Sequence, residues 1–261
     1  MSKRFQEYYK ANPDMVSSPF GGIDGIHRDM MLKIFELLDI DLEGRRVLDV
    51  GCGRGFTGEV VAECGGEYFG ADLVASREGL RMILADAFML PFPDATFDAV
   101  FCIDVFEHIP DSIGAAREFH RLLRQGGFVF LSVPNYSNVA GLVKKYCETL
   151  GSYEKHTWAP FGNWKPQEFE QFITGRRIRR AFREAGFERL RVLAHPYEVD
   201  GGLFPWIAHP SISEGIRFRL QRLFAMIGPV VARVWPGASL HLFWKIDRGN
   251  GPSGKKGESE P

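Results

Sequence analysis

The stretch that decides the fold is Val47-Leu48-Asp49-Val50-Gly51-Cys52-Gly53-Arg54-Gly55. A run typical of a buried strand leads directly into glycines at alternate positions, and a helical pattern follows them. Glycine adopts positive φ without strain and lets a ligand approach the backbone closely. In open α/β sheets, nucleotide-like ligands bind at such a loop, at the carboxyl end of the first strand. The stretch therefore predicts an α/β domain that binds a nucleoside.

Short β-rich runs alternate with helical patterns on both sides of this loop. The expected strands are Arg46–Val50, Tyr68–Asp72, Arg81–Ala85, Phe97–Ile103, Phe128–Val133, Glu188–Ala194 and Leu240–Ile246. The expected helices are Asp29–Leu38, Thr57–Cys64, Ser112–Arg124 and Pro166–Ala185. Strands that are apolar throughout and separated by helices indicate a parallel sheet covered on both faces.

The pattern also divides the chain into three parts. Residues 1–43 are expected to form an N-terminal helical lid segment, and residues 248–261 a disordered tail rich in glycine and charge. The domain between them, 44–247, carries irregular, aromatic-rich or helical insertions at about 135–165 and 195–238. Within the second insertion, Gly215–Gly228 places apolar residues at helical spacing among arginines. Two interpretations stay open: a lid helix packed on the domain, or a helix in peripheral contact with a membrane surface.

Composition narrows the class of protein. A net charge of −1 provides no overall field that would attract nucleic acid, so a nucleic-acid substrate is not expected. The four cysteines form no C-x-x-C pair, which argues against a zinc site of that type and against a disulfide framework. No signal-peptide pattern is seen, and no apolar run approaches the ~20 residues needed to span a bilayer. We therefore expect a cytoplasmic protein.

Acidic residues beside the glycine loop bear on its ligand. Gly53-x-Gly55-x-x-Gly58 satisfies the dinucleotide pattern, but counted from Gly51 the third glycine would fall at Phe56. A pyrophosphate favours backbone N–H groups and no nearby carboxylate, so Asp49 is poorly placed for it. S-adenosylmethionine (SAM) carries an ammonium and a sulfonium and lacks phosphate, and it suits this loop better. An NAD-dependent oxidoreductase, and a strand–helix turn without any ligand, remain the alternatives.

Two further carboxylates follow the next strands. Asp72 ends the second expected strand, where it can accept hydrogen bonds from both ribose hydroxyls of a nucleoside. Asp86-Ala87-Phe88 follows the third, where the carboxylate can accept from an adenine amino group and Phe88 can supply apolar contact. The alternatives are a solvated loop residue for Asp72 and a helix N-cap for Asp86.

Together with Leu90–Asp98, Phe101–Ile109 and Leu122–Phe128, these motifs resemble the class I SAM-dependent methyltransferases, in particular the small-molecule branch related to ubiquinone-biosynthetic enzymes. The resemblance implies a Rossmann-like, doubly wound seven-stranded sheet with the last strand antiparallel, helices on both faces and helical lid insertions. It implies SAM as methyl donor and S-adenosylhomocysteine as product. The expected cofactor-binding residues are Asp49, Gly51, Cys52, Gly53, Gly55, Asp72, Leu73, Asp86, Ala87, Phe88 and Ile103.

A polar group after the fourth strand suggests the catalytic residues. His108 has the pKa range of a general base, and Glu107 precedes it; alternatively, this turn only shapes the cofactor pocket. Spacing i, i+3, i+4 would place Asp104, Glu107 and His108 on one face of a helical turn. With His156 they resemble the divalent-metal site of some related enzymes, although Asp104 stands where those carry Glu. A divalent metal is therefore a second, open hypothesis.

The acceptor is expected to be a small apolar or aromatic molecule. Aromatic residues in the two insertions would suit a cleft for such a compound: Tyr136, Tyr146, Tyr153, Trp158, Phe161, Trp164, Phe204 and Trp206. We therefore predict O-methylation of a small molecule. N- or C-methylation of a small molecule or lipid, and a non-catalytic nucleoside-binding module, remain alternatives. The sequence indicates no oligomeric state.

Overall fold

The computed structural model describes residues 7, 11, 25–73, 81–149, 170–195, 197–209 and 211–249. Within them lies one seven-stranded sheet of order β3-β2-β1-β4-β5-β7-β6. Its strands are β1 (Arg46–Val50), β2 (Glu67–Asp72), β3 (Met82–Leu84), β4 (Phe97–Ile103), β5 (Leu123–Pro134), β6 (Arg189–Ala194) and β7 (His241–Asp247). The bounds of β1 and β4 are those the sequence predicts.

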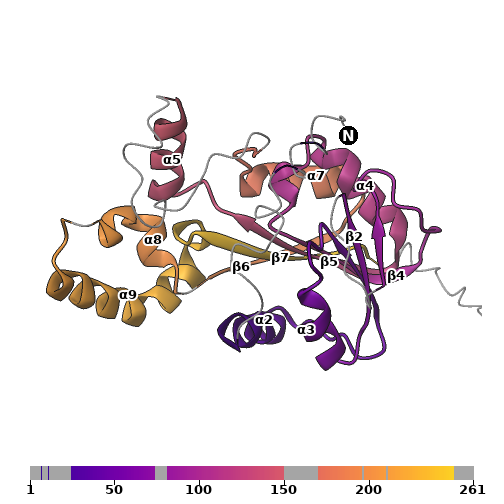
Figure 1. Cartoon of the computed structure of the whole chain (residues 1–261), viewed down its shortest axis with the longest axis horizontal. Coiled ribbons are helices and arrows are strands. Elements are labelled where there is room, and N and C mark those ends of the chain that lie inside the picture. The colour runs from indigo at the N-terminus through magenta and orange to yellow at the C-terminus, as the bar shows by residue number, and fades with distance from the viewer. Residues whose placement is uncertain are drawn as a thin grey trace, which may run out of the picture.

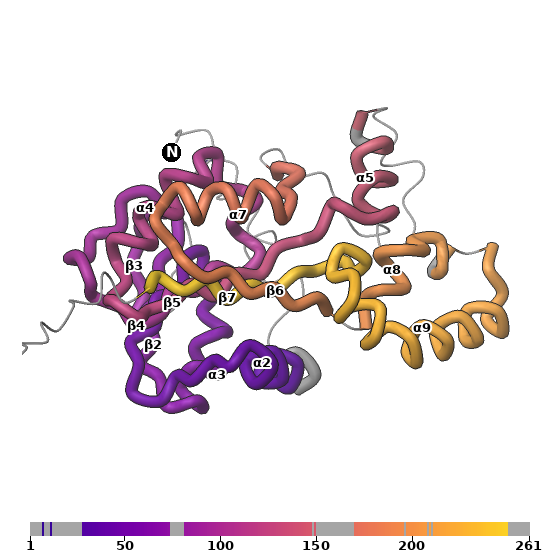
Figure 2. Tube along the Cα trace, turned by 180° about the vertical axis from the view of Figure 1, so that it is seen from behind, coloured from indigo at the N-terminus to yellow at the C-terminus, as the bar shows by residue number. Residues whose placement is uncertain are grey.

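The sheet is doubly wound, as expected. α2 (Gly25–Leu38) and α3 (Thr57–Glu63) lie on one face, and α4 (Ser112–Leu122) and α7 (Gly175–Glu184) lie on the other (Figures 1 and 2). β1 pairs in parallel with both β2 and β4, so the strand order reverses beside β1. In open α/β sheets, the crevice at the carboxyl ends of the strands flanking such a reversal is where ligands bind. The Gly51–Gly55 loop leaves β1 at this position.

β7, the last strand of the chain, confirms the prediction that this strand is antiparallel. β7 lies between β5 and β6 and runs antiparallel to both. Its Trp244 is almost fully buried, and the guanidinium carbon of Arg179 from α7 lies 4.6 Å from the ring centroid. The strand is therefore fixed in the sheet by packing on the α7 face.

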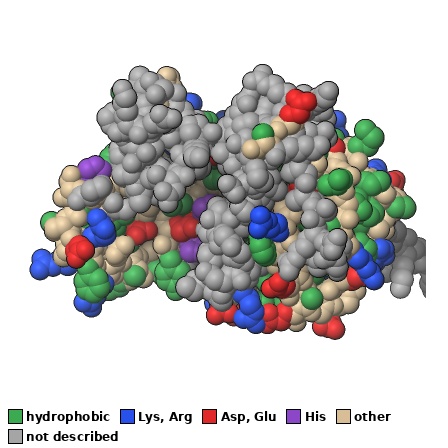
Figure 3. Space-filling model, viewed as in Figure 1, with side chains coloured by type: hydrophobic (Ala, Val, Ile, Leu, Met, Phe, Trp, Pro, Cys, Tyr) green, Lys and Arg blue, Asp and Glu red, His purple; other side chains and the backbone are tan. Residues whose placement is uncertain are grey.

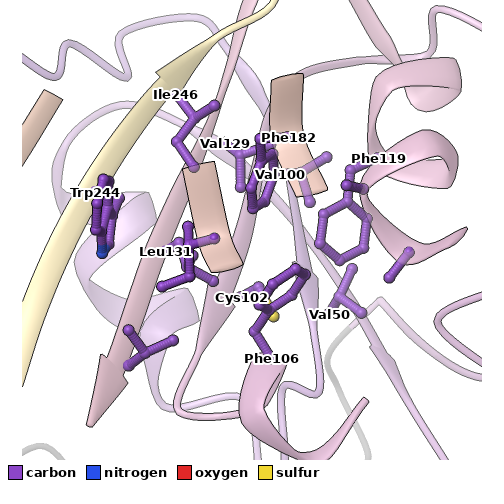
Figure 4. Packing of buried hydrophobic residues seen from close by; sticks show 14 of the residues in the cluster. Val50, Val100, Cys102, Phe106, Phe119, Val129, Leu131, Phe182, Trp244 and Ile246 are labelled. Atoms are coloured by element: carbon purple, nitrogen blue, oxygen red, sulfur yellow. The ribbon is translucent and has the colours of Figure 1, made fainter. Parts of the chain in front are cut away.

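Aromatic side chains pack the two faces of the sheet. On the α4 and α7 face, Phe106 stacks on Phe182 with ring centroids 5.3 Å apart, beside Cys102 and Phe119 (Figure 4). On the other face, Phe35 of α2 meets the edges of Phe101 and Phe130 at 5.6 and 5.3 Å. Burial of such large apolar side chains is the main stabilising contribution, since it removes apolar area from water.

Several predicted bounds differ from the structure. α4 ends at Leu122 rather than Arg124, and β5 begins at Leu123 rather than Phe128. In the insertion expected at about 135–165, α5 (Val139–Thr149) is helical. α7 begins at Gly175 rather than Pro166, and 170–174 is not helical. The Thr174 side chain accepts a hydrogen bond from the Arg177 backbone N–H, so Thr174 is the N-cap that sets this start.

The second insertion is mostly helical. It contains α8 (Val199–Leu203), the short turn η3 (Pro205–Ala208), α9 (Glu214–Val234) and the short turn η4 (Pro236–Ala238). α9 runs past the predicted end at Gly228 and includes Pro229. Within the residues that the structure describes, no helix combines the length and the apolar character needed to cross a bilayer.

Candidate functional site

The loop after β1 has a backbone that only glycine tolerates well. Gly51, Gly53 and Gly55 have φ of 76°, 53° and 73°. The backbone N–H groups of Gly51 and Cys52 donate to the Ala71 carbonyl at 2.7 and 3.3 Å, which fixes the loop against the end of β2. A Cβ on Gly51 would lie 2.4 Å from Val105 Cγ2. The loop is therefore both left-handed and tightly packed, as a close backbone approach to a ligand requires.

Asp49 and Asp72 place two buried carboxyl groups beside this loop. Asp49 Oδ2 accepts a hydrogen bond from the Tyr68 hydroxyl at 3.0 Å. Burial raises the pKa of Asp49 to about 7; the Asp72 carboxylate adds to the rise, whereas hydrogen bonds from Tyr68 and Thr57 oppose it. Asp72 Oδ2 accepts from the Gly53 backbone N–H at 2.9 Å, which ties the end of β2 to the loop. Asp49 beside the loop favours a cationic ligand and disfavours a pyrophosphate, whereas Asp72 at the end of β2 can hold the ribose of either kind of nucleoside.

The other predicted cofactor residues lie on the neighbouring strand ends. Asp86 Oδ1 accepts from the Phe88 backbone N–H at 3.1 Å, so it structures its own turn, but no helix begins there and Asp86 is not the helix N-cap of the alternative interpretation. Ala87 is buried, and Phe88 packs against the core. Leu73 directly follows Asp72, and Ile103 is the last residue of β4. The roles of these residues toward a cofactor stay predictions.

The Cys52 and Cys102 side chains contribute packing to this region. Both thiols are buried, and burial raises the pKa of each. They therefore remain protonated at neutral pH, which makes them poor nucleophiles.

The turn after β4 has a different shape from the one predicted. Asp104 has φ 51° and lies before the short turn η2 (Phe106–His108). Its Oδ1 accepts from the Ser132 hydroxyl of β5 at 2.9 Å. Asp104, Glu107 and His108 therefore do not share one helical turn, because the left-handed residue at Asp104 breaks it.

Glu107 and His108 are largely buried and have opposite pKa shifts. Burial and the nearby Asp104 carboxylate raise the pKa of Glu107 well above its usual range. Burial, assisted by the positive charge of Lys144, lowers the pKa of His108 to about 4. Glu107 Oε1 lies 3.8 Å from His108 Nε2. At neutral pH, His108 is thus neutral, so it is a weaker base than the sequence suggested, and Glu107 keeps its proton to a higher pH than an ordinary carboxyl group does.

A buried ion pair lies next to this turn. Lys144 of α5 donates to Glu170 Oε1 at 2.5 Å, and the Tyr136 hydroxyl donates to the same oxygen. Lys144 and Glu170 are 1% and 6% exposed, so the pair is shielded from water. Burial raises the pKa of Glu170 to about 7. The Gln171 backbone N–H donates to the Glu107 carbonyl at 2.9 Å, which joins the two groups.

A second ion pair connects the insertion to the sheet. His241 Nδ1 of β7 lies 2.8 Å from Glu198 Oε2. Glu198 directly precedes α8. Partial burial alone would lower the pKa of His241, but the Glu198 carboxylate outweighs it and raises this pKa to about 9. Asp104 and Glu107 contribute to the rise. Figure 3 shows acidic and histidine side chains gathered on this face near the middle of the molecule.

Sequence reasoning missed four of these residues. Lys144, Glu170, Glu198 and His241 carry no motif, and their ion pairs join positions 26 and 43 residues apart in the chain. For Lys144, a signal was present: it directly follows the apolar run Val139–Val143, and Ala140 lies one helical turn before it. A charged residue on an apolar helix face indicates a buried partner.

The metal hypothesis gains no support from the described residues. Among them, no three His, Cys, Asp or Glu side chains are grouped as a metal ion would need. The fourth predicted ligand, His156, lies outside the described residues. We therefore assign no step to a metal.

The predicted aromatic lining is only partly described. Tyr136 is buried at the ion pair, whereas Tyr146 is exposed on α5. Phe204 and Trp206 lie near each other at η3, with ring centroids 6.1 Å apart. Tyr153, Trp158, Phe161 and Trp164 lie outside the described residues.

Comparison with known proteins shows similarity to methyltransferases. A family model described as a methyltransferase domain matches residues 25–192, which include the loop, Asp72, Asp86 and the Glu107-His108 turn. A ubiquinone biosynthesis O-methyltransferase of Pseudomonas aeruginosa is 32% identical over 170 residues, covering 60% of this chain and 70% of that protein. A protein of the same name from Alkalilimnicola ehrlichii is 33% identical over 148 residues, covering 50% of this chain and 59% of that protein.

Solved structures show the same fold at low sequence identity. A SAM-dependent methyltransferase from Archaeoglobus fulgidus has a TM-score of 0.54 at 17% identity, covering 84% of this chain and 93% of that chain. A phosphoethanolamine N-methyltransferase of Haemonchus contortus has a TM-score of 0.58 at 15% identity, covering 94% of this chain and 60% of that chain. These likenesses concern the fold alone, because one fold can host many functions.

The packing of the loop predicts a graded loss of stability. Gly44 and Gly51 both have positive φ, but a Cβ on Gly44 would meet nothing within 4 Å. Gly44→Ala should cost about 1–2 kcal/mol of unfolding free energy from backbone strain alone. Gly51→Ala should cost about 1–3 kcal/mol more, because its Cβ overlaps Val105. Urea unfolding measures both, and Val105→Ala should recover part of the second loss. Equal costs at the two glycines would contradict the tight packing.

At neutral pH, the ring of His108 should be uncharged and the ring of His241 should carry a positive charge. We expect the His108 ring to stay neutral until the pH falls to about 4, and the His241 ring to stay protonated until the pH rises to about 9. Titration of the ring signals by NMR measures both. In Glu198→Gln, the His241 midpoint should fall, since burial then acts without the opposing carboxylate. A His108 midpoint between 6 and 7 would show that its ring is solvated.

Proposed function

The chain belongs to the methyltransferase domain family, and from this premise we propose that it transfers the methyl group of SAM to an oxygen atom of a small apolar or aromatic molecule. It is a class I SAM-dependent methyltransferase with a Rossmann-like fold. The observation that carries the proposal is the left-handed glycine loop with Asp49 and Asp72 beside it, inside the region that the family model matches.

The residues present suit SAM. It supplies a methyl group activated by attachment to a positively charged sulfur. The loop glycines would allow its close approach to the backbone, and Asp49 and Asp72 would provide negative charge beside it. Asp72 would hold the ribose, and Asp86 with Phe88 would hold the adenine. NAD is disfavoured by Asp49, because a carboxyl group beside the glycine loop opposes binding of its pyrophosphate, whereas Asp72 suits the ribose of either cofactor.

The turn after β4 would supply the group that removes the proton of the acceptor. Methylation of an oxygen or nitrogen also requires that the acceptor lose its proton. His108 is neutral at physiological pH, so a ring nitrogen can take that proton if the acceptor lies within hydrogen-bond reach. Glu107 and the Lys144–Glu170 pair surround the histidine with polar groups that would orient the acceptor. The rest of the catalytic effect would come from holding donor and acceptor in line.

The relatives support oxygen as the methylated atom. Two proteins at 32% and 33% identity carry the name ubiquinone biosynthesis O-methyltransferase, which points to an aromatic acceptor of related chemistry. We place the protein in the cytoplasm as part of the proposal, supported by four cysteines that form no disulfide with each other.

Removal of the Asp72 carboxylate should weaken SAM binding. Loss of charge-assisted hydrogen bonds to the ribose predicts an affinity about 10- to 100-fold lower for Asp72→Ala in isothermal titration. Asp72→Asn, which keeps an acceptor for the Gly53 N–H, should lose less. The exposed Asp94→Ala is the matched control and should bind SAM as the wild type does. Unchanged affinity in Asp72→Ala would refute the ribose assignment.

A screen of acceptors tests the activity itself. Purified protein with methyl-labelled SAM is incubated with phenolic, quinone-like and lipid acceptors, and labelled product and S-adenosylhomocysteine are measured. With an acceptor identified, His108→Asn should lower kcat by about 100-fold or more while leaving SAM affinity unchanged, because a general base contributes a factor of this order. His209→Asn serves as the control. SAM binding without S-adenosylhomocysteine formation across the screen would favour a non-catalytic binding module.

A further inference from the structure

α9 exposes an unusual amount of apolar surface. Phe218, Met226, Val230 and Val234 are 61%, 72%, 64% and 79% exposed. Ile216, Leu223 and Trp235 are also exposed, so half of the large exposed hydrophobic side chains in the described part of the chain lie within or next to this helix. Single exposed apolar residues are normal on a protein surface, but a continuous apolar patch marks a place where something binds.

The opposite side of α9 is already used by the fold. Gly228 and Ala232 are buried, and Phe224 and Val231 pack partly against the core. The helix contacts α8, β6, η3 and η4. At 100° per residue these positions share one side of the helix, whereas Leu223, Met226 and Val230 lie on the other. The lid interpretation from the sequence therefore accounts for one side of α9 and leaves the outer side unexplained.

The outer side of α9 is also basic. Arg219, Arg222 and Arg233 are exposed, and the only acidic residue in the helix is Glu214 in its first turn. Figures 1 and 2 place α9 at one end of the molecule, and Figure 3 shows basic and apolar side chains next to one another at that end. Arg219 precedes Leu223 by four residues and Arg222 precedes Met226 by four, so each arginine lies about one helical turn from an exposed apolar residue.

We propose that the outer side of α9 binds an anionic lipid surface, with the helix lying parallel to the membrane plane. Such a surface provides negative headgroups for the arginines and an apolar layer for Leu223, Met226 and Val230. Trp235, at the end of α9, is half exposed and has the amphipathic ring that is enriched at membrane interfaces.

Charge decides between lipid and a second copy of this chain. A symmetric dimer through this face would bring two sets of arginines together with no acidic partner except Glu214. Like charges in a low-dielectric interface repel strongly, which disfavours that occupant. An anionic bilayer presents the opposite sign over its whole area. The inference concerns attachment and stands independently of the acceptor that the enzyme methylates.

The test is flotation of the full chain with vesicles. Vesicles of phosphatidylglycerol and phosphatidylcholine are compared with vesicles of phosphatidylcholine alone. The wild type should float with the anionic vesicles only, and high salt should weaken this binding. Arg219→Gln with Arg222→Gln should reduce vesicle affinity about fivefold for each charge removed. Met226→Asp with Val230→Asp should abolish flotation.

Matched controls distinguish binding through α9 from nonspecific electrostatic or hydrophobic adsorption of the protein to vesicles. Arg176→Gln with Arg177→Gln removes two exposed arginines from α7, and Leu37→Asp changes an exposed apolar residue on α2. Both should float as the wild type does. Circular dichroism and SAM affinity verify that each variant is folded. Absence of flotation by the folded wild type, or equal flotation of the α9 variants and the wild type, would overturn the proposal. So would a dimer in sedimentation that Met226→Asp dissociates.

Discussion

The structure depends on one constraint, the left-handed backbone that the chain adopts directly after β1. Positive φ at Gly51, Gly53 and Gly55 lets the loop fold against Ala71 and Val105 with no room for a side chain at Gly51. Because β1 lies where the strand order reverses, this turn opens at the crevice of the sheet. The carboxyl group of Asp49 then decides which class of nucleoside the turn accepts, and Asp72 suits the ribose of either class.

Burial sets the chemistry of the neighbouring side chains. Asp49, Glu107 and Glu170 each have a raised pKa, because the environment that shields them from water disfavours their charged form. Lys144 lies against Glu170, and the Glu198 carboxylate keeps His241 protonated at neutral pH. The site thus combines carboxyl groups whose pKa is raised by burial with two ion pairs. Perturbed groups of this kind concentrate where proteins carry out reactions.

The local pattern of apolar and polar residues was enough to predict the sheet. It failed where contacts between segments distant in the sequence determine the structure. The bounds of β1 and β4 follow from short runs that are mostly apolar. The start of α7 was wrong because Pro166 is a permitted first residue, whereas the Thr174 cap governs the described helix. The ion pairs of Lys144 and His241 could not be predicted, because their partners meet only after α5 and α8 pack beside the sheet. The glycine loop could be recognised without knowledge of long-range contacts, because its positive φ angles favour glycine at these positions whatever packs around them.

The central claim is that this turn selects a cationic nucleoside over a pyrophosphate cofactor. The most direct measurement is isothermal titration of the purified wild type with SAM and, in a parallel experiment under the same conditions, with NAD. The account predicts saturable binding of SAM at one site per chain and no measurable binding of NAD. Saturable binding of NAD together with no binding of SAM would contradict it.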